Sequence, residues 1–310
     1  MPLHPQSQEF INAIAVANAP GWSDMPLAEA RQTFCELGLF GNGPQLECVR
    51  DASVGQIPIR IYQKHQHNNP AVVAFFHGGG WVLGDLETHD TLCRRLAYAS
   101  DCCVVAVHYR RAPEARYPAA LHDCFQVVEE IAAGHVVPAA DPTRIVLAGD
   151  SAGGNLVAAV SMKARDNGFK LAGQVLMYPA LATDFTTDSY RDFATGHGLT
   201  SETMQWFWAQ YLNETTTSDP LAAPLLAQSL QDLPPTHIMT AEYDVLRCEG
   251  ELFAQRLQEA GVTTSLRRYD GMLHGFIHFS EVFDDAHVAV RDCAQVIQQM
   301  TSDRGIHRGE

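Results

Sequence analysis

A serine at position 151 lies in a glycine-rich turn between two apolar segments. Its motif, Gly149-Asp-Ser-Ala-Gly-Gly154, follows the strand-like run 144–148 and precedes an apolar helical pattern. Glycines two residues before and two residues after the serine permit a tight reversal where a Cβ would clash with neighbouring chain. Such a turn leaves the serine side chain projecting, as a nucleophile requires. The alternative is a glycine-rich turn at the end of a core strand, without chemistry.

A second glycine cluster, His77-Gly-Gly-Gly-Trp81, follows the apolar run 71–76. When a serine attacks a carbonyl group, negative charge develops on the carbonyl oxygen, and preorganised backbone N–H groups stabilise it. Glycines let that oxygen come close, so residues 78–80 are candidate donors. The alternative, a phosphate-binding loop, is disfavoured because neither G-x-x-x-x-G-K-[ST] nor G-x-G-x-x-G occurs in the chain.

A serine nucleophile needs a histidine base and an acid that orients the histidine. Asp244 follows the strand-like segment 237–241, and His274 follows the strand-like segment 263–269. Catalytic groups of open α/β sheets gather beyond the carboxyl ends of the strands. We therefore predict that Ser151, Asp244 and His274 converge at that edge.

Two alternatives concern these side chains. Glu242 and Asp270 also lie near the ends of the relevant strands and compete with Asp244 for the role of the acid. His278 follows His274 by four residues and could form a metal-binding pair with it, although Gly275 and the absence of an H-E-x-x-H pattern disfavour a metal site.

The two motifs together resemble the hormone-sensitive-lipase-like branch of the α/β-hydrolases, the bacterial family IV carboxylesterases. The resemblance covers most of the chain and includes further motifs: Gly84-Asp-Leu-Glu-Thr-His-Asp90, Tyr109-Arg-Arg-Ala-Pro-Glu114, Tyr117-Pro-Ala-Ala120, Tyr178-Pro179 and His274-Gly-Phe276. It implies an α/β-hydrolase fold, with a mostly parallel central sheet, helices on both faces and a helical cap.

The same resemblance assigns roles to individual residues. The nucleophile corresponds to Ser151, the acid to Asp244 and the base to His274. The oxyanion hole corresponds to the glycines Gly78, Gly79 and Gly80, the last two above all, and to the N–H of Ala152. No metal or organic cofactor is implied.

Four positions depart from the family pattern. His108 stands where the family usually has Asp, and Arg111 stands where it usually has Leu. After the acid, Val245 and Cys248 replace the usual Pro and Asp. The first pair lies outside the catalytic residues, whereas the second pair belongs to the loop that must hold Asp244.

The elements that position these residues follow from hydropathy. Strand-like and helix-like runs alternate from about residue 71 onward, which predicts a mostly parallel sheet covered on both faces. Segments 46–49 and 57–62 are predicted to form a leading antiparallel pair. The helix 155–162 is apolar nearly all round and should be buried. Six residues of the C-terminal helix form one apolar stripe: Val282, Ala286, Val290, Cys293, Ile297 and Met300.

Residues 1–45 and 183–215 do not follow this alternation, and we expect them to form a cap over a catalytic domain made of 46–182 and 216–310. Helical patterns occur within the first segment around 10–17 and 27–40. Five aromatic residues could line a substrate pocket or could simply pack the cap on the body: Trp81, Trp206, Phe207, Trp208 and Tyr211.

Composition fits a soluble enzyme. The 310 residues are 46% hydrophobic and 18% charged, and the formal charge of −15 disfavours binding to nucleic acid or anionic lipid. The eight cysteines include no C-x-x-C pair, so disulfides are not expected. The sequence shows no export signal and no run of 18 apolar residues, which predicts a cytoplasmic protein without a membrane span. The resemblance to the family adds the expectation of a homodimer.

We therefore expect a serine carboxylesterase that hydrolyses short- to medium-chain acyl esters through an acyl-serine intermediate. Two alternatives remain. An amidase or acyltransferase would keep every catalytic residue, and comparison of amide with ester turnover separates it. A non-catalytic ligand receptor on the same fold would lack the catalytic histidine, which His274 argues against.

Overall fold

The computed structural model describes residues 2–17, 20–36, 42–65 and 70–302. In these residues eight strands form one sheet, in the order β1-β2-β4-β3-β5-β6-β7-β8. Strand β2 runs antiparallel to both of its neighbours, and every other pair is parallel. The strands are β1 Cys48–Val54, β2 Ile57–Gln63, β3 Val72–Phe76, β4 Cys103–Val107, β5 Ile145–Asp150, β6 Gly173–Met177, β7 Thr236–Tyr243 and β8 Thr264–Leu273. The predicted fold class and the leading antiparallel pair are confirmed.

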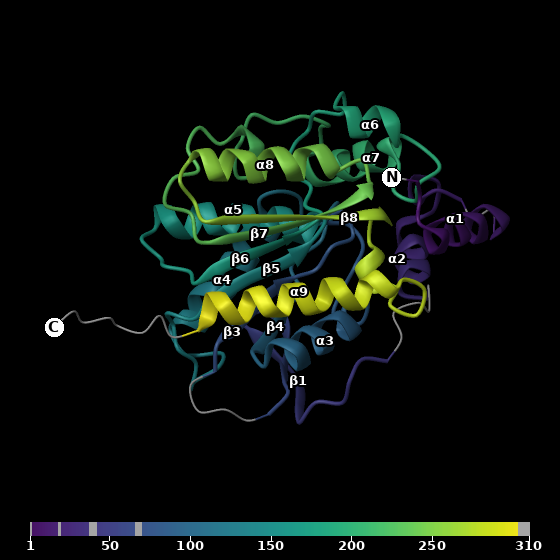
Figure 1. Ribbon diagram of the computed structural model, residues 1–310. Coiled ribbons are helices and arrows are strands. Elements are labelled where there is room, and N and C mark those ends of the chain that lie inside the picture. The colour runs from purple at the N-terminus through teal and green to yellow at the C-terminus, as the bar shows by residue number, and fades with distance from the viewer. Residues whose placement is uncertain (1, 18–19, 37–41, 66–69, 303–310) are drawn as a thin grey trace.

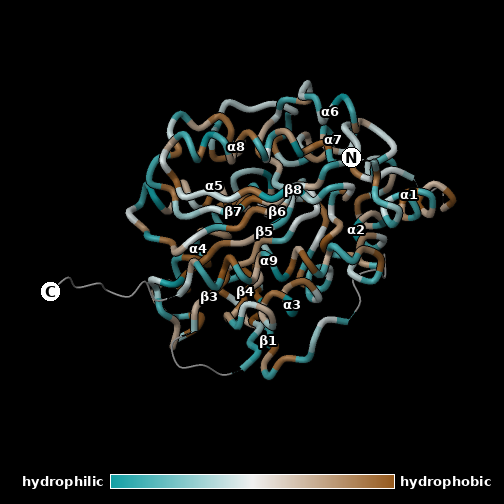
Figure 2. The backbone as a smooth tube through the Cα atoms, viewed as in Figure 1, coloured by the Kyte–Doolittle hydropathy of each residue, from teal (hydrophilic) through white to brown (hydrophobic). Residues whose placement is uncertain are grey.

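Helices cover both faces of the sheet (Figure 1). Helices α3 (Asp90–Ser100) and α9 (Asp284–Thr301) pack on one face, and α4 (Ala119–Ala132), α5 (Ala152–Asp166) and α8 (Arg247–Glu259) pack on the other. Every residue of β3 to β6 is therefore buried, as two covered faces require. Figure 2 shows the hydrophobic colour concentrated on these central strands.

The nucleophile turn rests on a very close contact between α5 and β3. A Cβ on Gly153 would lie 1.9 Å from the carbonyl oxygen of Phe76, so only glycine allows the helix to begin there. Nearly all of α5 is buried, as predicted. In α9 the residues Ala286, Val290, Cys293 and Ile297 are buried against the sheet. Both helices thus serve to hold the strand ends in place.

Four helices lie together beyond the ends of β7 and β8 to which the arrowheads point (Figure 1). They are α1 (Pro5–Ala17), α2 (Leu27–Glu36), α6 (Asp188–Asp192) and α7 (Ser201–Leu212). Helix α2 begins where predicted and ends at Glu36, and residues 37–40 of the predicted helix lie outside the described residues. Three short 3-10 turns complete the elements: η1 (Trp22–Asp24), η2 (Pro224–Leu226) and η3 (Phe276–His278).

Arg31 attaches α2 to the loop that follows the glycine cluster. Its guanidinium donates to both carboxylate oxygens of Glu114 at 2.7 and 2.8 Å, to the carbonyl oxygen of Val82 at 2.9 Å and to that of Ala112 at 3.0 Å. The planar guanidinium satisfies these acceptors simultaneously, which a lysine could not do.

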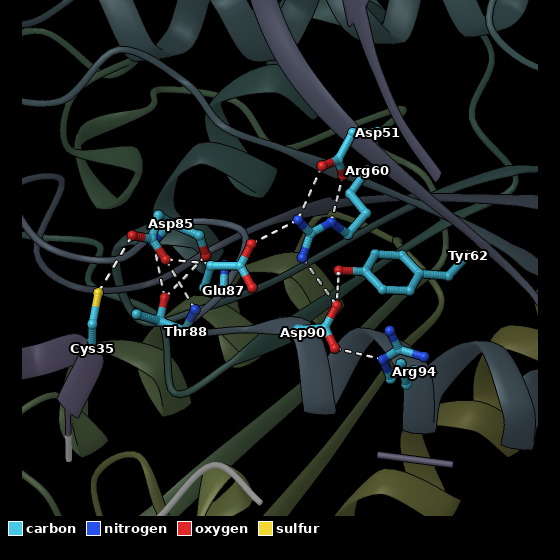
Figure 3. Close-up of polar contacts among 9 residues, drawn as sticks. All are labelled: Cys35, Asp51, Arg60, Tyr62, Asp85, Glu87, Thr88, Asp90 and Arg94. Carbon is cyan, nitrogen blue, oxygen red and sulfur yellow. Dashed lines mark hydrogen bonds and ion pairs between the residues drawn. The ribbon is translucent and has the colours of Figure 1, made fainter. Parts of the chain in front are cut away.

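A polar network fixes segment 84–90 against the antiparallel edge of the sheet (Figure 3). Arg60 of β2 donates to Glu87 at 2.7 Å and to Asp90 at 3.2 Å, and it also pairs with Asp51 of β1. Arg111 donates to the carbonyl oxygen of Gly84 at 2.6 Å. The arginine that replaces the family's usual leucine therefore helps to hold this segment.

All eight cysteines are unpaired, and none of the described helices combines the length and hydrophobicity needed to span a bilayer. Two of the buried histidines, His77 and His237, bear on how stability depends on pH. His77 follows β3 and is 2% exposed, and His237 lies in β7 and is 4% exposed. Burial lowers the pKa of His77 well below its usual value and also lowers the pKa of His237, because a buried imidazolium loses hydration.

We expect the thermal midpoint to fall as the pH is lowered from about 7.5 to about 5.5. The folded-state pKa of each group lies below the unfolded value of about 6.5, so this contribution to stability is complete above that pH and is lost below it. Each group contributes at most about 1.4 kcal/mol per pH unit. Replacing His237 by Asn, which retains a partner for Ser265 Oγ 2.8 Å away, should flatten the dependence. A midpoint that is unchanged on acidification would contradict the assignment.

Candidate active site

Ser151 occupies a strained turn between β5 and α5. Its φ of 53° and ψ of −119° are unusual for a residue with a side chain. Backbone hydrogen bonds to β6 and to the segment after it hold it: the Ser151 N–H donates to the Met177 oxygen at 2.8 Å, and the Ala180 N–H donates to the Ser151 oxygen at 3.2 Å. The side chain is thereby fixed above the carboxyl end of the sheet.

The structure brings His274 and Asp244 to this serine. His274 Nε2 lies 3.0 Å from Ser151 Oγ, and His274 Nδ1 lies 2.7 Å from Asp244 Oδ2. Asp244 Oδ1 accepts from the Leu246 N–H at 2.9 Å, and the residue is 1% exposed. Because a carboxylate only accepts, it fixes the proton on Nδ1 and leaves the Nε2 lone pair facing the serine hydroxyl. This arrangement can remove the hydroxyl proton as the oxygen attacks.

The competing acids point elsewhere. Glu242 accepts from the Gly271 N–H at 2.6 Å, and Asp270 is exposed. His274 and His278 do not act as a pair either, because His278 Nε2 lies 3.1 Å from Asp150 Oδ2, on a different carboxylate from that of His274.

The acid loop is held by a serine that sequence reasoning missed. Ser189 of α6 donates its hydroxyl to the Val245 oxygen at 2.6 Å and accepts from the Cys248 N–H at 3.2 Å. Val245 is fully buried. The two residues that replace the family's Pro and Asp are thus tied down by a helix 56 positions earlier in the chain, and no local pattern signals such a contact.

A buried carboxyl group lies behind the same loop. Glu249 is 1% exposed and accepts from the Leu181 N–H at 3.1 Å. Burial raises its pKa well above the usual value, and the nearby charge of Asp244 adds to the increase. Burial thus favours the neutral form of Glu249, behind the loop that carries Asp244.

The glycine cluster differs in one respect from the expectation. The Gly78 N–H donates to Asp150 Oδ1 at 2.9 Å, so it is not available to a substrate oxygen. Gly79 and Gly80 have φ values of 97° and 60°, a reversal held by the Val82 and Leu83 N–H groups on the Gly79 oxygen. In the described part of the chain neither of their N–H groups donates to a protein acceptor. Ala152 is the first residue of α5, where helical N–H groups lack an intrahelical partner.

Three of the five aromatic residues form a buried stack. Trp81, Trp208 and Tyr211 are fully buried; the Trp81 ring lies 4.4 Å from Tyr211 at 2° and 4.5 Å from Trp208. This stack packs α7 onto the end of the glycine cluster. Helix α7 is apolar on several faces, so its sequence could not show which aromatic rings would face the active site.

Phe207 and Trp206 lie outside this stack. The Phe207 ring packs directly on Gly80, where a Cβ would be 2.1 Å from the ring atom Cδ1. Trp206 is partly buried and its ring lies 5.1 Å from that of Phe207. Phe207 is thus in direct contact with Gly80, one of the candidate oxyanion donors.

The chain is similar in sequence to known α/β-hydrolases and esterases. A family model described as the alpha/beta hydrolase fold matches residues 73–278. An arylesterase of Saccharolobus solfataricus is 36% identical over 285 residues, which are 89% of this chain and 93% of that protein. Carboxylesterase NlhH of Mycobacterium tuberculosis is 38% identical, with 77% of this chain and 78% of that protein covered.

The structures agree as well. The hyperthermophilic esterase of the archaeon Pyrobaculum calidifontis superimposes with a TM-score of 0.92 at 37% identity, covering 97% of this chain and 99% of that chain. The likeness therefore includes the four helices beyond the sheet as well as the sheet itself.

Proposed function

The chain belongs to the hormone-sensitive-lipase-like branch of the α/β-hydrolases and is a carboxylic ester hydrolase, and from this premise we propose that Ser151, His274 and Asp244 are its catalytic triad. One observation supports the proposal above the others: hydrogen-bond distances of 3.0 and 2.7 Å connect Ser151, His274 and Asp244 in that order. We further propose that Gly79, Gly80 and Ala152 supply the oxyanion hole.

Acylation begins when Ser151 Oγ attacks the ester carbonyl carbon and His274 Nε2 takes the hydroxyl proton. Asp244 stabilises the imidazolium that forms and holds its orientation. The N–H groups of Gly79, Gly80 and Ala152 stabilise the tetrahedral oxyanion, assisted by the positive end of α5. The imidazolium then protonates the departing alkoxide, which leaves an acyl-serine ester.

Deacylation repeats these steps with water. His274 takes a proton from a water molecule as its oxygen attacks the acyl carbonyl carbon, and the same N–H groups stabilise the second tetrahedral intermediate. Collapse of that intermediate breaks the bond to Ser151 Oγ, which recovers its proton from the imidazolium and releases the carboxylic acid.

The substrates that we propose are esters of short- to medium-chain acids. The Phe207 ring against Gly80 supports a limit on chain length, because it occupies space next to the candidate oxyanion hole. We also propose that segments 1–45 and 183–215 act as the cap, while the cytoplasmic location and the homodimer remain predictions. An amidase or acyltransferase would use the same triad, so the substrate assay must separate them.

The test is hydrolysis of p-nitrophenyl acetate, butyrate, octanoate and palmitate, with p-nitrophenyl butyramide as the amide comparison. A fluorophosphonate probe should label the wild-type protein, and mass spectrometry should find the label on Ser151. Ester turnover with labelling at Ser151 supports the proposal. Amide turnover that matches ester turnover would favour an amidase, and a protein that neither turns over nor takes the label would favour a receptor.

Replacing Phe207 by Ala should extend the accepted acyl chain. Removal of the ring opens space beside Gly80, and a few methylene groups accommodated in an apolar pocket change the ratio of kcat/KM values by about 10-fold or more. We expect kcat/KM for the octanoate relative to the acetate to rise accordingly. Gln205→Ala, an exposed position on the same helix, is the matched control. An unchanged ratio would show that Phe207 does not limit chain length.

A further inference from the structure

One buried carboxylate beside the nucleophile has no part in the mechanism above. Asp150 precedes Ser151 and is 4% exposed. Its carboxylate accepts from the Gly78 N–H at 2.9 Å, lies 3.1 Å from His278 Nε2 and lies 3.2 Å from His89 Nε2. A buried carboxylate needs such partners, because it has lost its hydration.

Two partners of Asp150, Gly78 and His278, belong to different parts of the proposed catalytic site. Gly78 is covalently next to Gly79, the candidate oxyanion donor. His278 ends the 3-10 turn η3, which begins two residues after His274. Asp150 itself adjoins Ser151. A single carboxylate therefore connects the nucleophile turn, the oxyanion loop and the loop of the catalytic base.

His89 is fixed from its other side. Its Nδ1 lies 2.8 Å from Thr88 Oγ1, and Thr88 is bound through its backbone and side chain to Asp85 at 2.8 to 2.9 Å (Figure 3). The network that anchors segment 84–90 thus continues to Asp150. The ring of His89 also lies 4.7 Å from the ring of His278, edge to face.

The charge state of the carboxylate agrees with these contacts. Burial by itself raises the pKa of Asp150, but His89 and His278 outweigh that effect and hold the pKa well below its usual range. The two histidines therefore favour the ionised form of Asp150.

A metal ion is the alternative occupant of this cluster. The nitrogen atoms of His89 and His278 and a carboxylate oxygen of Asp150 lie within 4.8 Å of one another. The Gly78 N–H, however, is directed at the same carboxylate and lies 3.2 Å from His89 Nε2. A cation held there would face the positive end of that N–H dipole.

We infer that His278 and His89 are positioning residues. They fix the carboxylate of Asp150 and thereby hold Ser151, His274 and Gly79 in their positions relative to one another. This inference rests on the proposed function. Its strongest link is His278, because the imidazole–carboxylate contact joins the loop of the catalytic base to the nucleophile turn across 128 positions of sequence. Displacement of a catalytic group by about 1 Å can lower the rate by about 100-fold.

The central test compares His278→Phe with His278→Gln. Phenylalanine keeps an aromatic ring and removes the donor, whereas the glutamine amide can place an N–H where imidazole Nε2 lies. Turnover of p-nitrophenyl butyrate is measured per serine labelled by the fluorophosphonate, so that misfolded protein is not counted. We expect His278→Phe to lower kcat per labelled serine by about 10- to 100-fold, with KM much less affected. His278→Gln should recover most of that loss.

Two further variants complete the design. Asp150→Asn removes the charge with little change of shape and should also lower kcat per labelled serine. His287→Phe, at an exposed position of α9, is the matched control and should behave as the wild type. In a crystal structure of His278→Phe the Ser151 Oγ to His274 Nε2 distance should exceed the 3.0 Å of the wild type.

The outcomes separate this inference from the proposed function. Wild-type values of kcat per labelled serine in both His278→Phe and Asp150→Asn would overturn the inference while leaving the triad intact. A wild-type protein that is not labelled at Ser151 would overturn the proposed function. The Ser151 Oγ to His274 Nε2 distance in the His278→Phe crystal structure would then test by itself whether His278 positions these groups. If His278→Phe fails to fold, Asp150→Asn is compared with the wild type by itself. A lower kcat per labelled serine in Asp150→Asn supports the inference, and an equal value overturns it.

Discussion

Alanine at Ser151, alanine at His274 and the double substitution should each lower kcat by about the same factor, on the order of a millionfold. The two side chains perform one event, since the serine oxygen becomes nucleophilic only as His274 Nε2, 3.0 Å away, removes its proton. Once either side chain is absent, the other no longer contributes to the rate. The measurement is kcat for p-nitrophenyl butyrate with all three variants, at enzyme concentrations high enough to detect the residual rate.

KM should change little in these variants, because the substrate is held by contacts that neither side chain makes in the ground state. Ser229→Ala and His287→Ala are surface controls of the same chemistry and should retain wild-type turnover. Losses that add, so that the double variant is far slower than either single one, would mean that the two side chains act in separate steps. A fully active Ser151→Ala variant would identify another nucleophile.

Asp244→Asn should lower kcat by about ten-thousandfold without unfolding the protein. An asparagine side chain fits the same buried space, but its NH₂ group can face His274 Nδ1 as a donor. The imidazole then carries its proton on Nε2, where the lone pair is needed to accept the serine proton. Asparagine also cannot balance the charge of the imidazolium that forms during the reaction.

The comparison with Glu242→Gln gives this prediction its control. Glu242 was a candidate for the acid, but its carboxylate accepts from the Gly271 N–H. If Asp244 is the acid, Glu242→Gln should keep kcat within a few-fold of the wild-type value. Circular dichroism and the thermal midpoint should show that Asp244→Asn remains folded. A larger loss in Glu242→Gln than in Asp244→Asn would reverse the assignment of the acid.

The sequence alone allowed the sheet and the reactive groups to be predicted, because both depend on local patterns. Each of Ser151, Asp244 and His274 follows a strand-like run of residues, and parallel strands bring their carboxyl ends to one edge. The order serine, acid, histidine along the chain then left few candidates. Tertiary contacts were not needed to reach that point.

What could not be predicted depends on direction and on distant contacts. The glycine cluster showed that N–H groups were present, but it could not show that Gly78 donates to Asp150 instead of to a substrate. The apolar character of α7 did not reveal that Trp208 and Tyr211 face Trp81 while Phe207 faces Gly80. Such orientations are set by packing between elements, which no periodicity within one element encodes.

The position of Arg31 limits how evolution can alter this enzyme. Helix α2 is bound by one guanidinium to the backbone of Val82 and Ala112, which belong to the loops that shape the reaction centre, and to Glu114. The amino-terminal segment is therefore not an interchangeable module. A chimaera that receives this segment from a relative would lose these contacts to the loop after the glycine cluster unless the residues around 82 and 112–114 were exchanged with it, so we expect these stretches to change together.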